Sequence, residues 1–234
     1  MDVAILYSGG KDSTYAIEYC KERKWSIKYL LSIKPSRTDC YLFHYATVEL
    51  TRETSRILGI PHIYVNCDIA DPIKEAKIVK SIILENPVDA VVLGGTGLQV
   101  TQLKSIQDAL LPHNIEVFAS HSGLDHEESF RGMINKGYKI MITQVAGEGI
   151  HRWLGKMITK ENFSELKKDS IKYGFHIGFE GGPADTLVLD CPLFDRKIEV
   201  LKYSVNMENE YSGHLIVDSF KIVNKIKELS EVQD

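Results

Sequence analysis

The stretch SGGKDS at residues 8–13 gathers glycines, hydroxyls, a cation and a carboxylate directly after the apolar run VAILY. Gly9 and Gly10 permit positive φ angles and let a ligand approach the backbone with no Cβ in the way. If a helix begins here, the backbone N–H groups of its first turn point towards an anion, which the helix dipole also attracts. Further donors are Ser8, Ser13 and Lys11. The stretch therefore predicts a phosphate-binding turn.

Lys11 and Asp12 carry the two charges of this turn. We expect both to be exposed, with Lys11 a mobile cation that reaches a phosphate. A polyphosphate would repel Asp12 unless a metal ion lay between them, so this carboxylate predicts Mg²⁺. The alternative is an ordinary strand-to-helix turn in which Ser8 or Asp12 caps the helix. The adjacent glycines differ from the Walker A loop GxxxxGK[ST], which has four residues between its glycines.

Strands and helices alternate regularly through the first half of the chain. Short apolar strands are predicted at 3–7, 26–33, 62–67, 89–95 and 115–120. Helical patterns run up to Arg23 and over 45–58, 71–85 and 98–112. This alternation predicts an α/β fold with a doubly wound parallel sheet, whose ligands bind beyond the carboxyl ends of the strands. The turn follows the first strand, and Gly94 and Gly95 close the fourth, so both are predicted at that edge.

The pattern changes beyond residue 125. The expected elements are a helix at 126–136, a strand at 139–145, a helix at 161–172 and strand-like runs at 186–194, 197–205 and 214–223. The closely spaced runs predict a smaller α+β unit with an antiparallel or mixed sheet. We therefore expect two domains, one at residues 1–125 that carries the phosphate-binding turn and one at residues 126–234.

Composition narrows the class of protein. The 234 residues carry a formal net charge of −4 and a pI of about 6.1, which argues against nucleic acid as the main partner. The four cysteines form no CxxC pair, so neither a zinc knuckle nor a disulfide framework is indicated. No run approaches the roughly 20 apolar residues of a membrane helix, and the first residues do not resemble a signal peptide. We expect a cytoplasmic enzyme, and base rates favour a homodimer.

The turn resembles the SGGxDS signature of the N-type ATP pyrophosphatases, the PP-loop superfamily, which includes GMP synthetase and NAD synthetase. The resemblance implies an adenine nucleotide alpha-hydrolase-like fold and cleavage of ATP between its α and β phosphates. It implies that the turn holds the leaving pyrophosphate, with Lys11 and Asp12 catalytic and Asp12 the Mg²⁺ ligand. A substrate oxygen would form an adenylate, and a nucleophile such as ammonia would then displace AMP.

Two further stretches resemble the diphthine–ammonia ligase family of that superfamily. FEGGPADTLVLDCPLF at 179–194 is similar to a block of this family, and residues 40–61 are similar to its Tyr-x-x-His segment and the helix that follows. The resemblance implies an ATP-dependent carbon–nitrogen ligase that amidates diphthine, a modified histidine of a translation elongation factor. Ammonium would be the nitrogen donor.

Glu180, Gly181 and Gly182 read as a glycine turn with an acid at its edge. In a partly dry pocket this carboxylate could bind ammonium or the trimethylammonium group of diphthine. The alternative is a plain turn before a strand, with Glu180 in solvent. The family block also implies substrate-binding roles for Asp185 and Thr186, although Thr186 could equally be an ordinary strand residue.

His44 falls on the family's Tyr-x-x-His positions and is a candidate for binding substrate or nucleotide. Its alternative is a helix residue with a satisfied imidazole. The other histidines show no metal-ligand spacing, and we expect them to be scattered over the surface and loops. They are His62, His113, His121, His126, His151, His176 and His214.

The chain departs from the family pattern near the expected substrate side. Pro183 and Ala184 stand where the family has a second glutamate and an aromatic residue, and residues 99–107 lack a basic run. ASHSG also replaces a Pro-Leu-Trp-like stretch. These departures leave open a paralogous PP-loop ligase that amidates another carboxylate. A non-catalytic nucleotide-binding module similar to universal stress proteins is another alternative, whereas tRNA thiolation would require paired cysteines and a basic surface.

Overall fold

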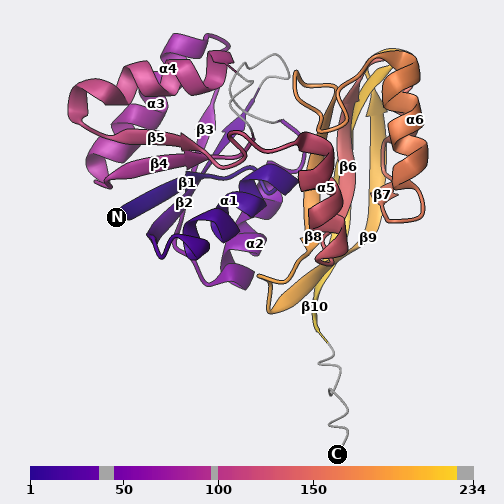
Figure 1. Cartoon of the computed structure of the whole chain (residues 1–234), viewed down its shortest axis with the longest axis horizontal. Helices are drawn as coiled ribbons and strands as arrows, with labels where there is room; N and C mark the ends of the chain where they lie inside the picture. Colours follow the sequence, from indigo (N-terminus) through magenta and orange to yellow (C-terminus); the bar gives the residue numbers. More distant parts are fainter. Residues whose placement is uncertain (37–44, 96–99, 226–234) are drawn as a thin grey trace, which may run out of the picture.

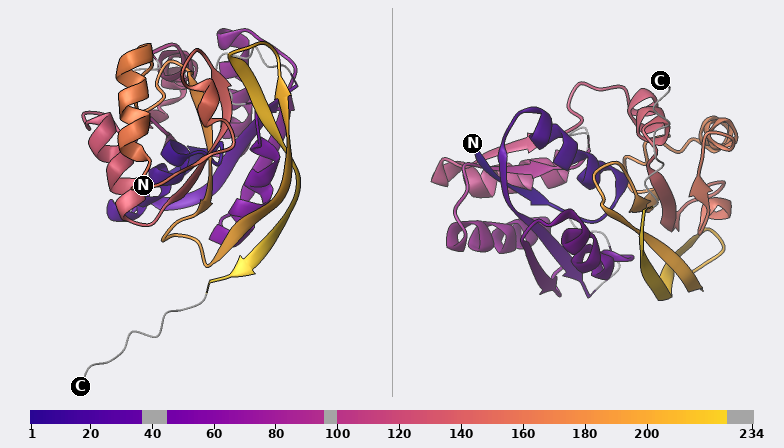
Figure 2. Two further views of the ribbon diagram at one scale, coloured as in Figure 1. Left: turned by 90° about the vertical axis from the view of Figure 1, so that its right-hand side faces the viewer. Right: turned by 90° about the horizontal axis from the view of Figure 1, so that it is seen from below.

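The computed structural model describes residues 1–36, 45–95 and 100–225, which form two five-stranded sheets side by side (Figures 1 and 2). The first sheet is parallel throughout, with the strand order β3-β2-β1-β4-β5. Its strands are β1 Asp2–Leu6, β2 Ser26–Pro35, β3 His62–Cys67, β4 Ala90–Leu93 and β5 Glu116–Ala119. The predicted parallel α/β sheet is confirmed.

Helices cover both faces of this sheet, because its strands point apolar side chains alternately to either side. Val3 and Ile5 of β1 pack with the helix α1, whereas Ala4 lies in a cluster with α3 and α4, on the opposite face (Figure 1). The helical elements are α1 Lys11–Glu22, the 3₁₀ helix η1 Val48–Leu50, α2 Thr51–Leu58, α3 Pro72–Glu85, α4 Val100–Leu110 and the 3₁₀ helix η2 Leu111–His113. In the described part of the chain, no helix has the length and apolar character to cross a membrane.

The helix predicted at 45–58 begins later than expected. Thr47 adopts a left-handed φ of 61°, and helical structure starts only at Val48. A β-branched residue in this conformation interrupts the helical backbone. Gly59 ends α2 with a φ of 66°, the usual place for glycine after a helix.

The strands β1 and β4 are neighbours at the centre of the sheet, with Ile5 paired to Val92. The chain runs from β1 to β2 and β3 on one side, then returns to β4 on the other side, so the strand order reverses between β1 and β4. Ligands of open α/β sheets bind beyond the carboxyl ends of the strands at such a point. Residues 8–13 follow β1, and Gly94 and Gly95 follow β4, so the two segments meet at this edge.

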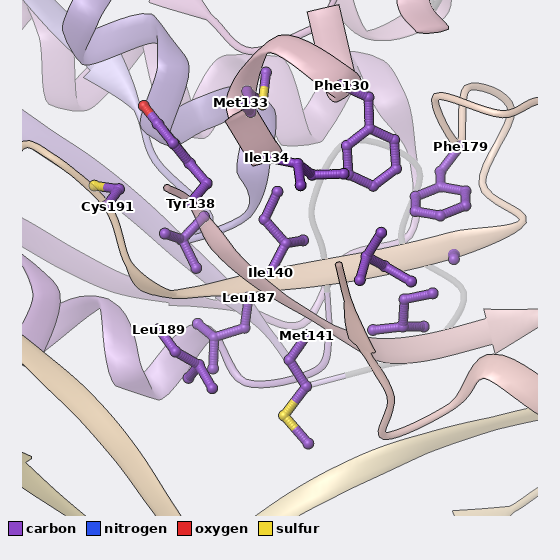
Figure 3. Close-up of a cluster of buried hydrophobic side chains, with 14 of the residues drawn as sticks. Phe130, Met133, Ile134, Tyr138, Ile140, Met141, Phe179, Leu187, Leu189 and Cys191 are labelled. Atoms are coloured by element: carbon purple, nitrogen blue, oxygen red, sulfur yellow. The ribbon is translucent and has the colours of Figure 1, made fainter. Parts of the chain in front are cut away.

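The second sheet is antiparallel and carries its own helices. Its strands are β6 Lys139–Ala146, β7 Met157–Ile158, β8 Ala184–Asp190, β9 Arg196–Met207 and β10 Ser212–Asn224. Its helices are α5 His126–Asn135, the 3₁₀ helix η3 His151–Trp153 and α6 Phe163–Tyr173. In its core, Phe130, Met133 and Ile134 of α5 meet Ile140 of β6 and Leu187 of β8 (Figure 3). Of the two expected possibilities, an antiparallel or a mixed sheet, the structure shows the antiparallel one. The strand β7 was not predicted, because two residues show no alternation.

The strand β8 connects the second sheet to the SGGKDS turn. The Val188 amide donates a hydrogen bond to the Gly9 carbonyl at 2.9 Å, and the Lys11 amide donates to Thr186 Oγ1 at 3.1 Å. The core of the second sheet also includes side chains of η1 and α2. The two sheets therefore share packed contacts at the turn. The division into two domains at residue 125 stays a prediction.

A buried carboxylate between α1 and the second sheet is expected to stabilise the fold. Glu18 accepts hydrogen bonds from the Tyr138 hydroxyl at 2.7 Å and from Lys136 Nζ at 2.6 Å. Tyr138→Phe removes the first bond and should lower the free energy of unfolding by about 1.5–3 kcal/mol, the usual range for hydrogen bonds to charged groups. Urea unfolding measures the change. The control is Tyr173→Phe, which removes an exposed hydroxyl bonded to Lys172, and equal stability of the two variants would contradict the prediction.

Candidate functional site

A cavity of about 750 Å³, its open mouth included, lies where the carboxyl edge of the parallel sheet meets the start of β8. Candidate residues from three separate parts of the sequence line it. They are Ser8, Gly10, Lys11, Asp12, Ser13, Gly94, Gly95, Glu180, Asp185 and Thr186. Among the described candidates, Gly9, Gly181 and Gly182 do not line the cavity. The candidate His44 lies outside the described residues.

Hydrogen bonds of the Ser13 hydroxyl stabilise the SGGKDS turn. Ser13 Oγ accepts a hydrogen bond from the Ser8 amide at 3.2 Å and donates to the Gly10 carbonyl at 3.1 Å. Gly9 has a φ of 79°, in the left-handed region that favours glycine. Gly10 is the N-cap residue of α1, and glycine has no side chain with which to cap the helix. The alternative in which Ser8 or Asp12 caps the helix is therefore wrong.

Lys11 is buried, contrary to our expectation of a mobile cation on an exposed turn. Its side chain is only 3% exposed, and Nζ donates hydrogen bonds to Asp12 Oδ2 at 2.6 Å and to the Gly178 carbonyl at 2.8 Å. The rings of Phe130 and Phe179 lie 5.3 and 5.5 Å from Nζ. Such a desolvated ammonium requires charged or polar partners, which the carboxylate and the carbonyl supply. The side chain of Asp12 is 33% exposed and lines the cavity. In the Lys11–Asp12 pair, the carboxylate is therefore the group that a ligand can reach.

Gly94 lets the end of β4 approach the first turn of α1 more closely than a side chain would allow. A Cβ at this position would lie 2.6 Å from the Ser13 backbone nitrogen and 2.7 Å from the Asp12 carbonyl carbon. Gly95 has a φ of 86°, and a Cβ there would lie 3.4 Å from Glu180 Oε1. The two glycines therefore provide the space in which three segments of the site meet.

The residues before and within β8 form the opposite wall of the cavity. Glu180 has a side chain only 9% exposed, so the alternative with this carboxylate in solvent is wrong. Gly181 and Gly182 have φ angles of 84° and 83°, which explains why glycines occupy this turn. Thr186 is both a strand residue and a site residue, because its hydroxyl accepts the Lys11 amide. Asp185 is half-buried on β8 and lines the cavity.

His121 is a site neighbour that the sequence analysis did not identify. It follows β5 at the same carboxyl edge and is 2% exposed, with its ring 4.3 Å from that of Tyr15. Its Nε2 lies 3.9 Å from Asp12 Oδ1, and its Nδ1 lies 3.2 Å from Ser120 Oγ. Burial lowers the pKa of His121 to about 4, although the Asp12 carboxylate opposes this effect. His121 is therefore a neutral imidazole beside Asp12 at neutral pH.

Two further histidines lie beside Glu180, although they were expected to be scattered; His176 does lie in a loop, whereas His126 begins α5. His126 Nδ1 lies 3.7 Å from Glu180 Oε1. His176 Nδ1 accepts hydrogen bonds from the amides of Gly178 at 3.2 Å and Glu180 at 3.4 Å. The two imidazole rings meet edge to face, with centroids 4.3 Å apart. Their proximity arises from the fold, since one lies at the start of α5 and the other precedes the glycine turn.

The donor set fits a metal ion that arrives with phosphates better than a resident metal. Within residues 1–36, 45–95 and 100–225, no three His, Cys, Asp or Glu side chains are placed to hold a metal ion. Asp12 supplies one partly exposed carboxylate at the cavity. Mg²⁺ typically takes one or two protein carboxylates, with phosphate oxygens and water completing its shell.

Comparisons with known proteins agree over most of the chain. Residues 1–109 match the family model described as the diphthamide synthase N-terminal domain, and residues 125–230 match the one described as the diphthamide synthase C-terminal domain. The human protein named diphthine–ammonia ligase is 30% identical over 228 residues, covering 86% of this chain and 83% of the relative.

More distant relatives carry the same name. The zebrafish (Danio rerio) diphthine–ammonia ligase is 26% identical over 220 residues, covering 85% of this chain and 86% of the relative. The Schizosaccharomyces pombe protein of that name is 25% identical over 228 residues, which cover 87% of this chain and 38% of the longer relative. With both family models matched and the human relative covered over most of its length, this chain belongs to the diphthamide synthase family.

Proposed function

We propose that this protein is a diphthine–ammonia ligase, an ATP-dependent carbon–nitrogen ligase that converts the carboxylate of diphthine to an amide. The observation that carries the proposal is the shared cavity. It brings the SGGKDS turn and the β4 glycines against the β8 segment, which comes from the other half of the chain. Membership of the diphthamide synthase family supports the same activity.

The proposed nucleotide end of the cavity is formed by the turn and by β4. The backbone of Gly9 and Gly10, with the hydroxyls of Ser8 and Ser13, would hold the phosphates of ATP. Gly94 and Gly95 would allow the nucleotide to lie close to the backbone. ATP, a substrate here, supplies the activated phosphorus and leaves as AMP and pyrophosphate.

The proposed catalytic charges are those of Lys11 and Asp12. Lys11 would neutralise negative charge on the departing pyrophosphate, and Asp12 would hold Mg²⁺ against the same phosphates. In this structure the two side chains hold one another at 2.6 Å. This contact holds both charges beside the cavity. With ATP bound, Lys11 would pair with a phosphate and Asp12 with the metal ion.

The proposed acceptor end is the β8 segment. Glu180, Asp185 and Thr186 would bind the substrates of the second step. Gly181 and Gly182 would form the turn that positions Glu180, and His44 would assist them. The protein substrate is proposed to be a translation elongation factor that carries diphthine, with ammonium as the second substrate. We further propose that the enzyme works in the cytoplasm and as a homodimer.

A paralogous ligase that amidates another carboxylate is the second candidate. Ala184 lines the cavity at a position where the family has an aromatic residue, and its smaller side chain would leave room for a different acceptor. Such a change would affect the choice of carboxylate, whereas the SGGKDS turn matches the family signature.

The test is to incubate the purified protein with ATP, Mg²⁺, ammonium and a diphthine-bearing elongation factor, then to identify the products. We expect AMP and pyrophosphate in equal amounts, together with one amide on the acceptor. AMP release that ignores this acceptor and responds to another carboxylate would favour the paralogous ligase. Formation of ADP, or ATP binding without turnover, would overturn both ligase assignments.

A further inference from the structure

The two oxygens of the Asp12 carboxylate have different neighbours. Lys11 Nζ donates a hydrogen bond to Oδ2 at 2.6 Å, whereas His121 Nε2 lies 3.9 Å from Oδ1. The second distance is longer than a hydrogen bond. His121 is 2% exposed and does not line the cavity, so it can influence a ligand in the cavity only through Asp12.

The His121 imidazole is held in place by contacts on its other sides. The His121 amide donates a hydrogen bond to the Gly95 carbonyl at 2.8 Å, which ties its backbone to the end of β4. Ser120 Oγ lies 3.2 Å from Nδ1. The Tyr15 ring of α1 packs against the imidazole, with ring centroids 4.3 Å apart. The fold therefore fixes the ring beside the first turn of α1.

The nitrogen of His121 that faces Asp12 is the one that makes no hydrogen bond. Within the described part of the chain, Nε2 is buried and has no hydrogen-bond partner. Buried polar atoms are rarely left unpaired, because they have also lost their bonds to water. Burial lowers the pKa of His121 to about 4, so the ring is neutral and carries one N–H. If the Ser120 hydroxyl donates to Nδ1, this N–H is on Nε2.

Asp12 is the anion among the charged and titratable neighbours of His121, which also include Lys11 and His126. Asp12 already has Lys11 and further contacts, so His121 would add a donor to a carboxylate that is engaged elsewhere. His121 belongs to ASHSG, which replaces the Pro-Leu-Trp-like stretch of the family. The imidazole is therefore a feature of this chain and lies outside the family pattern.

We propose that His121 is a positioning residue, whose Nε2–H donates a hydrogen bond to Asp12 Oδ1 when ATP and Mg²⁺ are bound. The proposal rests on the function given above, in which Lys11 pairs with a phosphate and Asp12 with the metal ion. Asp12 then loses its contact with Lys11, and a shift of its carboxylate by about 1 Å would bring Oδ1 to hydrogen-bond length from Nε2. Hydrogen bonds of this kind orient metal-binding side chains.

The test compares two amide side chains of different reach. His121→Gln places an amide N–H near the position of Nε2, whereas His121→Asn is shorter and reaches only the position of Nδ1, beside Ser120. His62→Asn is the matched control, because His62 is half-buried, contacts Ser32 Oγ at 2.9 Å and lies outside the cavity. Mn²⁺ binding to each protein is measured by electron paramagnetic resonance in the presence of α,β-methylene ATP, which resists cleavage between the α and β phosphates.

We expect the Kd for Mn²⁺ to rise by about 10–100-fold in His121→Asn, the usual loss when a partner of a metal-binding side chain is removed. His121→Gln and His62→Asn should stay within a few-fold of the wild type, and binding of the nucleotide without metal ion should change little in any variant.

Two further measurements separate positioning from a general loss of structure. Exchange of labelled pyrophosphate into ATP, dependent on the diphthine acceptor, should require more Mg²⁺ in His121→Asn and recover when Mg²⁺ is saturating. A damaged site would lose the maximal rate instead. In the wild-type complex with Mg²⁺ and α,β-methylene ATP, the ¹⁵N NMR shifts of His121 should show the proton on Nε2.

The outcomes distinguish this role from the ligase function. Wild-type Mn²⁺ affinity in His121→Asn, an equal loss in His121→Gln, or a proton on Nδ1 would overturn the positioning role and leave the ligase function standing. Wild-type protein that binds Mn²⁺ but shows no acceptor-dependent exchange would overturn the ligase function, and the Mn²⁺ comparison would still decide the role of His121. Wild-type protein that binds no Mn²⁺ would overturn the metal site at Asp12 together with the role of His121.

Discussion

Asp12→Asn is expected to lower the rate of AMP and pyrophosphate formation by about 10²–10³-fold, the usual loss when one preorganised electrostatic contact to the transition state is removed. The Asp12 carboxylate is 33% exposed at the cavity and holds Lys11 Nζ at 2.6 Å. Asparagine has the same shape and keeps an oxygen for Lys11, but it lacks the charge that a metal ion requires. The variant should therefore fold normally and show a higher Mg²⁺ requirement in the nucleotide assay.

The control for this change is Asp108→Asn. Asp108 lies on α4, is 62% exposed and pairs with Lys104 at 3.3 Å, so the same chemical substitution is made on the surface. We expect wild-type turnover from it. If Asp12→Asn kept more than half of the wild-type rate, the SGGKDS turn would not be the phosphate site.

The placement of the turn followed from local sequence, because a strand, two adjacent glycines and a helix start lie within a few residues of one another. The parallel sheet then brought Gly94 and Gly95 beside the turn through strand order alone, since β1 and β4 are neighbours. The positions of the turn and of the two glycines at this edge depend on the direction of the strands and on the alternation of strands and helices. A single sequence shows both.

The surroundings of the charged side chains could not be predicted in the same way. Phe130, Phe179 and Gly178 surround Lys11 from segments far along the chain, and no pattern within the turn indicates them. For this reason Lys11→Ala would remove packing as well as charge, and we expect it to destabilise the fold as well as the site. Asp12→Asn is the cleaner test.

The histidines show a second limit of sequence patterns. His121 and His126 lie at the two ends of the loop between β5 and α5, whereas His176 is separated from them by α5, β6, η3, β7 and α6. Metal-ligand spacing rules describe residues on one helix or one loop. They do not detect a group of histidines that the packing of the fold brings together. A useful indication was available for His121, which follows a strand at the same carboxyl edge as the turn.

Gly94→Ala is expected to lower kcat/KM for ATP by about 10²-fold, the loss that a displacement of about 1 Å at a reacting centre can cause. The new Cβ would lie 2.6 Å from the Ser13 nitrogen and 2.7 Å from the Asp12 carbonyl carbon. Both contacts are with backbone atoms, which cannot rotate away as a flexible side chain would. Either β4 or the first turn of α1 must move, so the phosphate-binding amides leave their positions. Overpacking of this kind should also cost about 1–3 kcal/mol of stability, measurable by urea unfolding.

Gly132→Ala distinguishes this effect from the general consequence of adding a methyl group. Gly132 lies within α5, and a Cβ there would meet nothing within 4 Å. Alanine should therefore stabilise this helix by roughly 0.5–1 kcal/mol and leave turnover unchanged. The same substitution is thus expected to act in opposite directions at two glycines, according to the space that each backbone leaves. Wild-type kcat/KM for ATP in Gly94→Ala would contradict the prediction, because it would mean that phosphate binding does not depend on the contact between β4 and α1.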